Sequence, residues 1–412
     1  MNRKNQIVAT LDLGSTKVTV LVAEISEKGL SVLGVGTAES EGLRKGMVTS
    51  IAKTVEAIKK ARHDAEQMSG CMISEVVAGV GGSHVFGVNN HAMVSPRQDE
   101  ITEMDVKRVI DLATTFSIPL DRDVINVLPQ QYVVGEQTGV KDPIGMSGAR
   151  LDVNVHFITA ARAAIENIQK CAERSGLQVV EFVANPLASA LAVLLDDERE
   201  LGVVVLDMGG DSCGLTIWAS GSLLHTCVIG AGGNLVTRDI ATGLRTPAAC
   251  AEELKVKYGA ACGQAVEVGE PMEVPSVGGR PAQVMPRHLL TEIIEPRTRE
   301  ILERVKQEIS KTGLNDMLPG GIVLTGGASQ MPGLVELVDE QLNLQARLGV
   351  PTGVQGLSSI MSNPALSTAY GLAVYAALPY TRDIPRPMLP VRQYRGGGGL
   401  GSWLKKVKSY LF

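Results

Sequence analysis

IVATLDLGSTKVTVLVAEI, residues 7–25, combines an apolar segment, a turn with Asp12 and Gly14, and a second apolar segment rich in β-branched residues. GVVVLDMGGDSCGLTIWAS, residues 202–220, repeats this order with Asp207 in the turn. Each segment predicts two strands joined by a tight turn. Because the two copies stand far apart in the chain, they indicate an internal duplication and two lobes of related structure.

A third segment, GIVLTGGASQMPGLVELVDEQL at 321–342, predicts a strand, a turn at Gly326 and Gly327, and an amphipathic helix. Helical periodicity also marks residues 51–68, 161–174 and 186–195. Strands and helices that alternate in both halves of the chain predict an α/β protein.

The turns carry chemistry suited to a nucleotide. Glycine lets backbone N–H groups approach a phosphate closely, and the hydroxyls of Ser15 and Thr16 add donors. Asp12 and Asp207 can hold a hydrated Mg²⁺, which prefers few carboxylates together with water and phosphate oxygens. Two such turns that face each other would hold a triphosphate between them.

The third turn, Gly326-Gly327-Ala328-Ser329, suits the nucleoside or its phosphates because it opens a helix. Lys17 could reach a phosphate or point to solvent, and the sequence leaves both open. Either Asp-x-Gly turn alone is explained by an ordinary tight turn. All three in order, each after an apolar strand, predict binding of ATP and Mg²⁺.

Two stretches depart from the repeated pattern. Residues 84–160 contain β-rich pieces around one helix at 104–116, which predicts an inserted α+β subdomain. Residues 230–311 contain helices near 233–244 and 288–311, which predicts a peripheral subdomain on the second lobe. The remaining divisions are 1–83 with 161–196 for the first lobe, 197–229 with 312–380 for the second lobe, 381–399 for a linker and 400–412 for a terminal helix.

Charge is unevenly spread along the 412 residues, whose net charge is −5. Residues 381–412 hold seven of the 39 Lys and Arg but only one of the 44 Asp and Glu. An acidic body argues against a general nucleic-acid binder, and a basic tail suggests contact with an anionic surface. Six scattered cysteines lack zinc spacing, and neither a signal peptide nor a run of about 20 apolar residues is evident. We therefore expect a reduced, cytosolic body.

The last residues predict an amphipathic helix that lies on a membrane. On a helical wheel, one face carries Leu400, Trp403, Leu404, Val407, Tyr410 and Leu411, and Lys406 and Lys408 flank that face. A helix docked on the body would show the same stripe, but the glycines at 396–399 favour the membrane. The candidate membrane residues are Trp403, Leu404, Lys405, Lys406, Val407, Lys408, Tyr410, Leu411 and Phe412.

LDLGSTK, LDMGGDS and IVLTGGAS resemble the phosphate-1, phosphate-2 and adenosine motifs of the actin/Hsp70/sugar-kinase superfamily. AEELK at 251–255 resembles the superfamily's E-x-x-K segment. The chain as a whole resembles the FtsA family of bacterial cell-division actin homologues. The most specific likenesses are the insert that begins GGSHVFGVNN, the segments VPSVGGRP and IIEPR, and the tail.

The resemblance implies a duplicated, two-lobed actin-like fold of ribonuclease-H-like lobes, with the inserted subdomain and a terminal amphipathic helix. It places Glu252 and Lys255 at the base and ribose. The implied nucleotide-binding residues are Asp12, Gly14, Ser15, Thr16, Lys17, Asp207, Gly209, Gly210, Asp211, Ser212, Gly232, Glu252, Lys255, Gly326, Gly327, Ala328 and Ser329.

Two positions depart from the family pattern. Asn185 stands where many relatives carry a Glu or Gln that orients the attacking water, so we expect slow ATP hydrolysis at most. Asp211 and Ser212 stand where many relatives have Gly-Thr, and a carboxylate beside the phosphates would repel them unless it points away or binds through the metal. The catalytic assignment and the geometry of the second turn therefore stay open.

The resemblance also implies partners. The segment EIIEPRTREILERVKQEISK would take up the C-terminal peptide of the tubulin homologue FtsZ, with Arg297 as the main contact and Arg299 or Arg304 beside it. The plainer interpretation is a solvated helix face with pairs such as Glu300–Arg304. Self-assembly into filaments, and contact of other division proteins with the insert, are implied as well.

The function that follows is a tether between FtsZ filaments and the cytoplasmic face of the inner membrane at the division site. Alternatives in the same superfamily are a small-molecule kinase or ATPase, a chaperone and a pilus-assembly protein. A kinase needs a carboxylate base, and the sequence offers no clear one. A chaperone needs a peptide-binding domain after residue 380, where only 32 residues remain.

Overall fold

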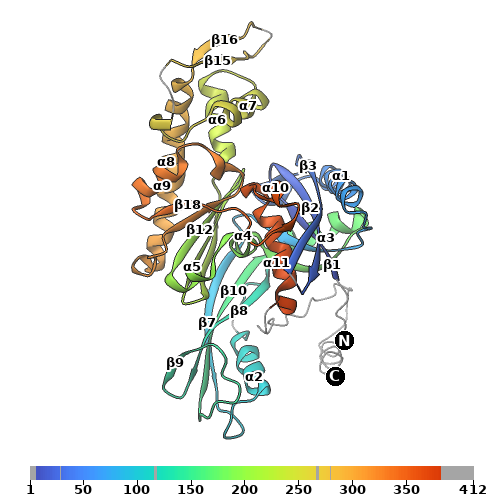
Figure 1. Cartoon of the computed structure of the whole chain (residues 1–412), viewed down its shortest axis with the longest axis vertical. Coiled ribbons are helices and arrows are strands. Elements are labelled where there is room, and N and C mark those ends of the chain that lie inside the picture. Colours follow the sequence, from blue (N-terminus) through green and yellow to red (C-terminus); the bar gives the residue numbers. More distant parts are fainter. Residues whose placement is uncertain (1–5, 28, 116–117, 266–268, 279, 382–412) are drawn as a thin grey trace.

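The computed structural model describes residues 6–381 except 28, 116–117, 266–268 and 279. The linker at 381–399 and the membrane helix at 400–412 therefore lie outside the described residues, apart from Thr381. The described part is elongated, with two core lobes near the middle and a smaller subdomain toward each end of the long axis (Figure 1).

The first lobe is built on a six-stranded sheet with the order β11-β6-β1-β2-β3-β19. β1 and β2 form the antiparallel hairpin expected from the first aspartate segment. Helix α1 begins after the N-cap Ser50 and ends at Gly70, whose φ of 68° suits glycine. The elements are β1 Gln6–Leu13, β2 Lys17–Ser26, β3 Gly29–Glu39, β4 Leu43–Arg44, β5 Met47–Val48, α1 Ile51–Ser69, β6 Glu75–Val80, α3 Arg162–Arg174, β11 Gln178–Ala184 and β19 Gln355–Gly356.

The second lobe and the inserted segment share one nine-stranded sheet, with the order β18-β17-β12-β13-β14-β7-β10-β8-β9. The first five of these strands belong to the second lobe and the last four to the insert. The elements are β7 Phe86–Val94, α2 Glu103–Ala113, β8 Arg122–Val134, β9 Gln137–Val140, β10 Leu151–Ala161, α5 Asp196–Leu201, β12 Val203–Met208, β13 Cys213–Ala219, β14 Ser222–Ile229, β17 Ile322–Thr325, α9 Leu334–Leu342 and β18 Ala346–Leu348.

The insert leaves the chain of the first lobe between β6 and α3, yet it pairs with the second lobe. Cys227 of β14 is the residue opposite Phe86 of β7 at this join. Side chains strengthen it: His156 bonds to Thr226 at 2.9 Å, and Gln130 donates to the Leu223 carbonyl at 2.7 Å. The insert is therefore attached to both lobes.

The peripheral part of the second lobe consists of helices with a small hairpin beyond them, at the top of Figure 1. Apolar residues of α6 and α8, such as Ile240 and Ile294, belong to the core of the second lobe. The elements are α6 Gly233–Gly243, α7 Ala248–Tyr258, β15 Pro271–Val274, β16 Gln283–Pro286 and α8 His288–Thr312.

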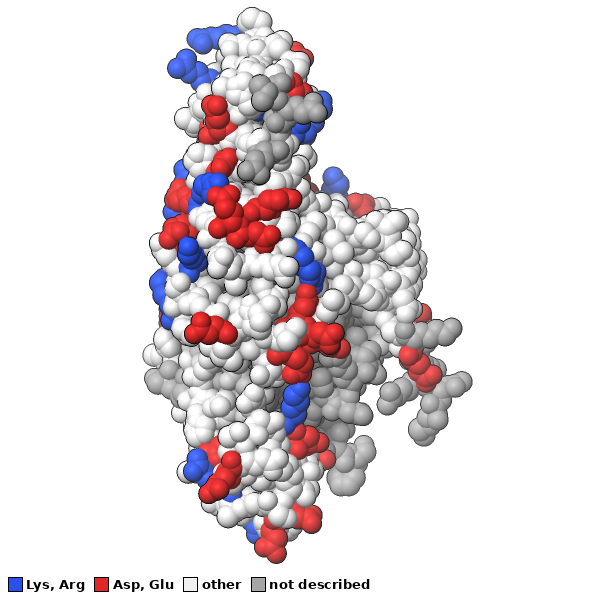
Figure 2. All heavy atoms as spheres, turned by 60° about the vertical axis from the view of Figure 1, so that its left-hand side comes forward, with Lys and Arg blue, Asp and Glu red and all other residues white. Residues whose placement is uncertain are grey.

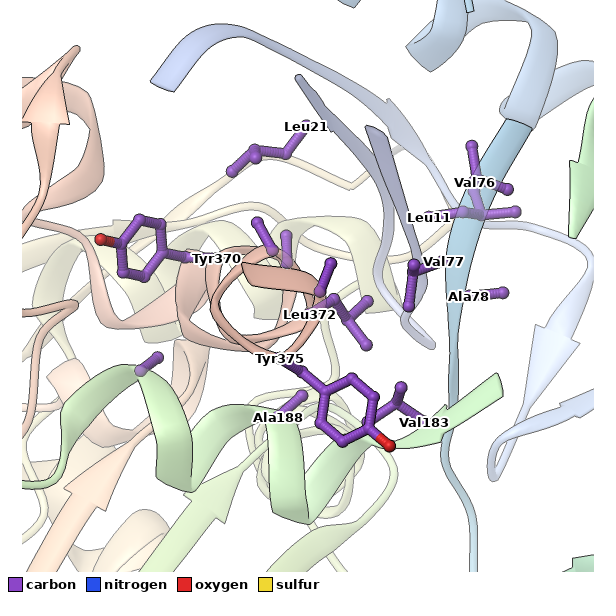
Figure 3. Close-up of a cluster of buried hydrophobic side chains, with 14 of the residues drawn as sticks. Leu11, Leu21, Val76, Val77, Ala78, Val183, Ala188, Tyr370, Leu372 and Tyr375 are labelled. Atoms are coloured by element: carbon purple, nitrogen blue, oxygen red, sulfur yellow. The ribbon is translucent and has the colours of Figure 1, made fainter. Parts of the chain in front are cut away.

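Two apolar helices cross near the middle of the molecule, α4 (Asn185–Val193) and α11 (Ser367–Thr381). A Cβ added to Gly371 of α11 would overlap the backbone carbonyl of Ala188 of α4, so only glycine permits this approach. Figure 3 shows Tyr375 of α11 lying close to Val183 and Ala188, and Leu372 of the same helix on the side toward Val77 of β6. Helices α4 and α11 are therefore both packed in the main hydrophobic core. None of the described helices combines the length and apolar character that crossing a bilayer requires.

Candidate functional site

The two aspartate turns have the same construction. In the first, the Gly14 amide donates to the Lys17 carbonyl at 3.0 Å, and in the second the Gly209 amide donates to the Ser212 carbonyl at 3.0 Å. The strands on either side pair antiparallel in equivalent register. Each aspartate is the residue before the last one of its first strand. The two residues are Asp12 and Asp207.

The turns face each other across the two lobes. A Cβ added to Gly210 would lie 2.6 Å from the Thr16 methyl, so the second turn packs directly on the first. Asp211 spans the lobes: its carboxylate accepts from the Lys45 amide and from the Asn234 side chain, each at 2.8 Å. Both oxygens of this unusual acid thus have protein donors, one from each lobe.

The two aspartates are held in an environment that resists negative charge. Asp12 is buried, and burial raises its pKa to about 7; the Lys17 ammonium lowers that pKa and the Asp207 charge raises it. Asp207 retains some accessible surface, yet desolvation also raises its pKa, against hydroxyl groups from Ser189 and Thr368 that lower it. A cation between these carboxylates would remove the electrostatic cost.

Helices α4 and α11 supply the polar groups around Asp207. Ser189 of α4 donates to Asp207, and Thr368 of α11 donates to the same carboxylate oxygen at 3.2 Å. The two hydroxyls are 2.9 Å apart. The crossing of these helices therefore positions the second aspartate.

Asn185, the first residue of α4, lies beside the other aspartate. Its Nδ2 is 3.5 Å from Asp12 Oδ1, and its Oδ1 has no hydrogen-bond partner among the described residues. Added Cβ atoms at Gly79 or Gly81 would meet this side chain, so β6 leaves a notch for it. Lys17 is half-buried, and burial lowers its pKa against the charge of Asp12, which places its ammonium in the field of that aspartate.

The third turn meets the second aspartate directly. Gly326 has a φ of 88°, and a Cβ there would overlap Asp207 Oδ1. The short 3-10 helix η3 (Gly327–Gln330) follows, and the amphipathic helix α9 begins only at Leu334. Ser329 is buried and donates to the Gly326 carbonyl at 2.7 Å, so its hydroxyl closes the turn.

The E-x-x-K segment lies in the same region. The Lys255 ammonium bonds to Glu252 at 2.7 Å, to Thr237 at 2.9 Å and to the Gly233 carbonyl at 3.3 Å. A Cβ added to Gly233 would lie 3.3 Å from the Ala328 methyl, which links α6 with the third turn.

Gly232 connects this region to the second aspartate turn. A Cβ there would lie 2.6 Å from the carbonyls of both Gly209 and Gly210. The residues predicted from the motifs therefore converge on one region. They supply backbone amides, two carboxylates, an ammonium group and close backbone approaches, a set suited to a polyanion with a divalent cation.

Four side chains of this region were not predicted from the sequence, namely Ser189, Asn234, Thr237 and Thr368. Ser189 is the one with a usable signal, because it follows Asn185 by one helical turn and must share its face. Among the described residues, no group of three or more His, Cys, Asp or Glu could hold a metal alone.

The residues predicted for a partner lie together on α8. Arg297 donates to Asp239 of α6 and to Glu300, and Arg304 donates to Glu300 at 2.6 Å. Arg299 pairs instead with Glu295 and Glu340. Figure 2, which brings the α8 side of the molecule forward, shows acidic and basic side chains mixed over this face.

Known proteins of similar sequence are cell-division proteins. A family model described as "Cell division protein FtsA" matches residues 204–371, and one described as "SHS2 domain inserted in FTSA" matches residues 82–159. The chain is 43% identical to the cell division protein FtsA of Pseudomonas aeruginosa, over 90% of each chain. It is 41% identical to that of Neisseria meningitidis, over 98% of this chain and 99% of the other.

Solved structures of similar shape share little sequence but the same fold. The PilM-PilN type IV pilus biogenesis complex aligns with a TM-score of 0.65 at 17% identity, over 90% of this chain and 99% of the other. MreB5 of Spiroplasma citri bound to ADP aligns with a TM-score of 0.53 at 13% identity, over 90% and 96%. The chain thus has an actin-like fold with an inserted subdomain.

Proposed function

Because the chain belongs to the FtsA family of cell-division proteins, we propose that it binds Mg-ATP between its two lobes and assembles into filaments that tether FtsZ to the membrane. The observation that carries the nucleotide part is the pair of facing turns with Asp12 and Asp207. Both carboxylates have raised pKa values, and a bound cation favours their ionised forms.

In this proposal the triphosphate takes the backbone amides of the two turns, between Gly14 and Lys17 and between Gly209 and Ser212. Asp12 and Asp207 hold Mg²⁺ through water, because Mg²⁺ binds few carboxylates and keeps waters and phosphate oxygens. MreB5 structures of the same fold carry ADP or AMPPNP, which supports a nucleotide in this class of cleft.

The adenosine would lie against the second lobe. Glu252 and Lys255, which bond to each other in this structure, would contact the base and ribose by exchanging that bond for bonds to the nucleoside. Ser329 contributes through its turn, since its hydroxyl is committed to the Gly326 carbonyl.

Substitution of the two aspartates tests the nucleotide site. Asp12→Ala and Asp207→Ala should each weaken ATP binding at least tenfold and remove its dependence on magnesium, as measured by titration calorimetry with and without Mg²⁺. Asp64→Ala, at an exposed position of α1, is the matched control and should bind as wild type does. Unchanged affinity and magnesium dependence in both cleft variants would sink the assignment.

Hydrolysis should be slow, with ATP acting mainly as a ligand for conformation and assembly. Asn185 lies beside Asp12 but an amide cannot act as a general base. Phosphate release from saturating Mg-ATP should therefore stay below about one turnover per minute, far under the usual enzyme range. Rapid, sustained release would contradict this role of Asn185 and favour a kinase or ATPase.

The partner sites are proposed on the periphery. The acidic C-terminal peptide of FtsZ would dock on α6 and α8 at the cluster of Arg297, Glu300 and Arg304, where its carboxylates would pair with the guanidinium groups. Other division proteins would bind the inserted subdomain at 84–160. The body is acidic, so we propose no nucleic-acid partner.

The membrane contact is proposed for residues 400–412. These residues would form an interfacial helix whose aromatic residues, Trp403 and Tyr410, lie at the boundary and whose lysines reach anionic headgroups. The protein would then be peripheral, on the cytoplasmic face of the inner membrane at the division site. One such helix binds weakly, and a filament that presents many binds by avidity.

A further inference from the structure

Every nitrogen of the Arg297 guanidinium already has a carboxylate partner. Nε and Nη2 donate to the two oxygens of Asp239, at 2.5 and 3.2 Å, and Nη1 donates to Glu300. Three of its five N–H donors are thereby engaged, and two carboxylates already balance its charge. A peptide carboxylate that is to pair with this arginine as closely therefore competes with one of the two.

The two carboxylates are not equally replaceable. Asp239 comes from a different helix, α6, and makes two bonds in a fork geometry that fixes the plane of the guanidinium. Glu300 comes from α8 itself, three residues along, and makes one bond. Its side chain is 45% exposed, against 32% for Asp239. Glu300 is the weaker and more accessible ligand.

Glu300 also has a second cationic partner. Its second oxygen accepts from Arg304 at 2.6 Å, one helical turn further along α8. If another carboxylate takes Nη1 of Arg297, Glu300 keeps an ion pair through Arg304. The exchange then leaves no charge without a partner, which keeps its cost low.

We propose that Glu300 is a built-in competitor that occupies the position on Arg297 taken by the carboxylate of an acidic partner peptide. Asp239 orients the guanidinium and stays in place, while Glu300 swings to Arg304 as the peptide binds. This inference rests on the proposed docking of such a peptide on α8. It adds that the free protein lowers its own affinity for the peptide.

Removing the competitor should strengthen binding. Glu300→Gln removes a charge at almost unchanged shape, and the competing bond is that of an exposed ion pair. We expect binding about two- to fivefold tighter at low salt, with the gain shrinking as salt screens the pair.

The test is fluorescence anisotropy of the full chain with the fluorescein-labelled C-terminal peptide of FtsZ as probe. Glu303→Gln is the matched control, because it removes the same charge from the same helix and Glu303, among the described residues, accepts a hydrogen bond from the neutral Gln307. Arg297→Ala reports the docking site itself and should lose at least tenfold in affinity. Thermal melting of each variant establishes that it is folded.

The outcomes separate the two claims. Tighter binding by Glu300→Gln than by Glu303→Gln, or binding by Glu300→Gln where wild type shows none, supports the competitor. Equal binding by these two variants, with Arg297→Ala still impaired, overturns the competitor but leaves the docking site standing. Binding that is indifferent to Arg297→Ala, or absent from every variant, overturns both.

Discussion

At the scale of single residues, the site holds two carboxylates, Asp12 and Asp207, whose ionised forms are disfavoured by burial. Asp12 is buried beside Asp207, and its pKa rises to about 7. An acid in such a place is maintained against stability, as groups at functional sites commonly are. A cation bound by the pair would offset this cost, so the proposed metal binding would be linked to stability.

The pH dependence of stability follows from this pKa. The unfolded chain ionises Asp12 near 3.8, whereas the native state keeps the proton up to about 7. Between these values the native state binds more protons, so the free energy of unfolding falls as pH rises and levels off above 7. Without nucleotide and Mg²⁺, Asp12→Asn should therefore gain stability relative to wild type across this window, on the order of 1–4 kcal/mol.

Urea unfolding at pH 5 and pH 8 measures the effect. The variant's advantage should be larger at pH 8, and Mg-ATP should stabilise wild type more than the variant. An identical pH dependence in the two proteins would show that Asp12 is not the strained carboxyl described here.

The residues of the site differ in whether a local sequence pattern predicts them or only a contact between distant parts of the chain explains them. Asp12, Asp207 and the glycines of the turns could be predicted, because a strand followed by Asp-x-Gly is a local pattern. The role of Asp211 could not, because its donors are Lys45 and Asn234, and the first of these belongs to the other lobe. A sequence pattern carries no information about such a contact.

At the scale of elements, the crossing of α4 and α11 supports the site. Each helix presents one hydroxyl to Asp207, from Ser189 and Thr368, and Gly371 sets how closely the helices approach. The sequence predicted α4, but no argument from it foresaw α11 as its partner. The periodicity of α11 is weak, because this helix is apolar on nearly all sides.

Gly371→Ala should separate the two helices. The new methyl would overlap the Ala188 carbonyl, so we expect a loss of about 1–3 kcal/mol in stability and a weaker affinity for Mg-ATP as the two hydroxyls shift. Gly263→Ala is the control, since an added Cβ there meets open space. Thermal unfolding and ATP titration measure both effects. A fully stable Gly371→Ala with normal ATP affinity would refute the coupling.

At the scale of the whole molecule, the inserted segment connects the two lobes. Its chain departs from the first lobe, while its strands extend the sheet of the second lobe through Phe86 and Cys227. The β-rich pieces of the sequence predicted its strands but not this join, which depends on one pair of residues and a few long-range side-chain bonds. The two α/β lobes, by contrast, followed from the duplicated turns and the alternating strands and helices, and the actin-like fold from the resemblance of the three motifs.

In the proposed function, Mg-ATP bound to the body controls attachment of the tail to a membrane. The most direct test is co-sedimentation with liposomes that contain anionic lipid. The full chain is compared with a chain that ends at Gly399, each with and without Mg-ATP, and Asp207→Ala serves as the variant that cannot respond to nucleotide. We predict that the full chain alone pellets and that Mg-ATP increases the bound fraction in wild type but not in Asp207→Ala. Equal pelleting by the full and the shortened chain would contradict the account.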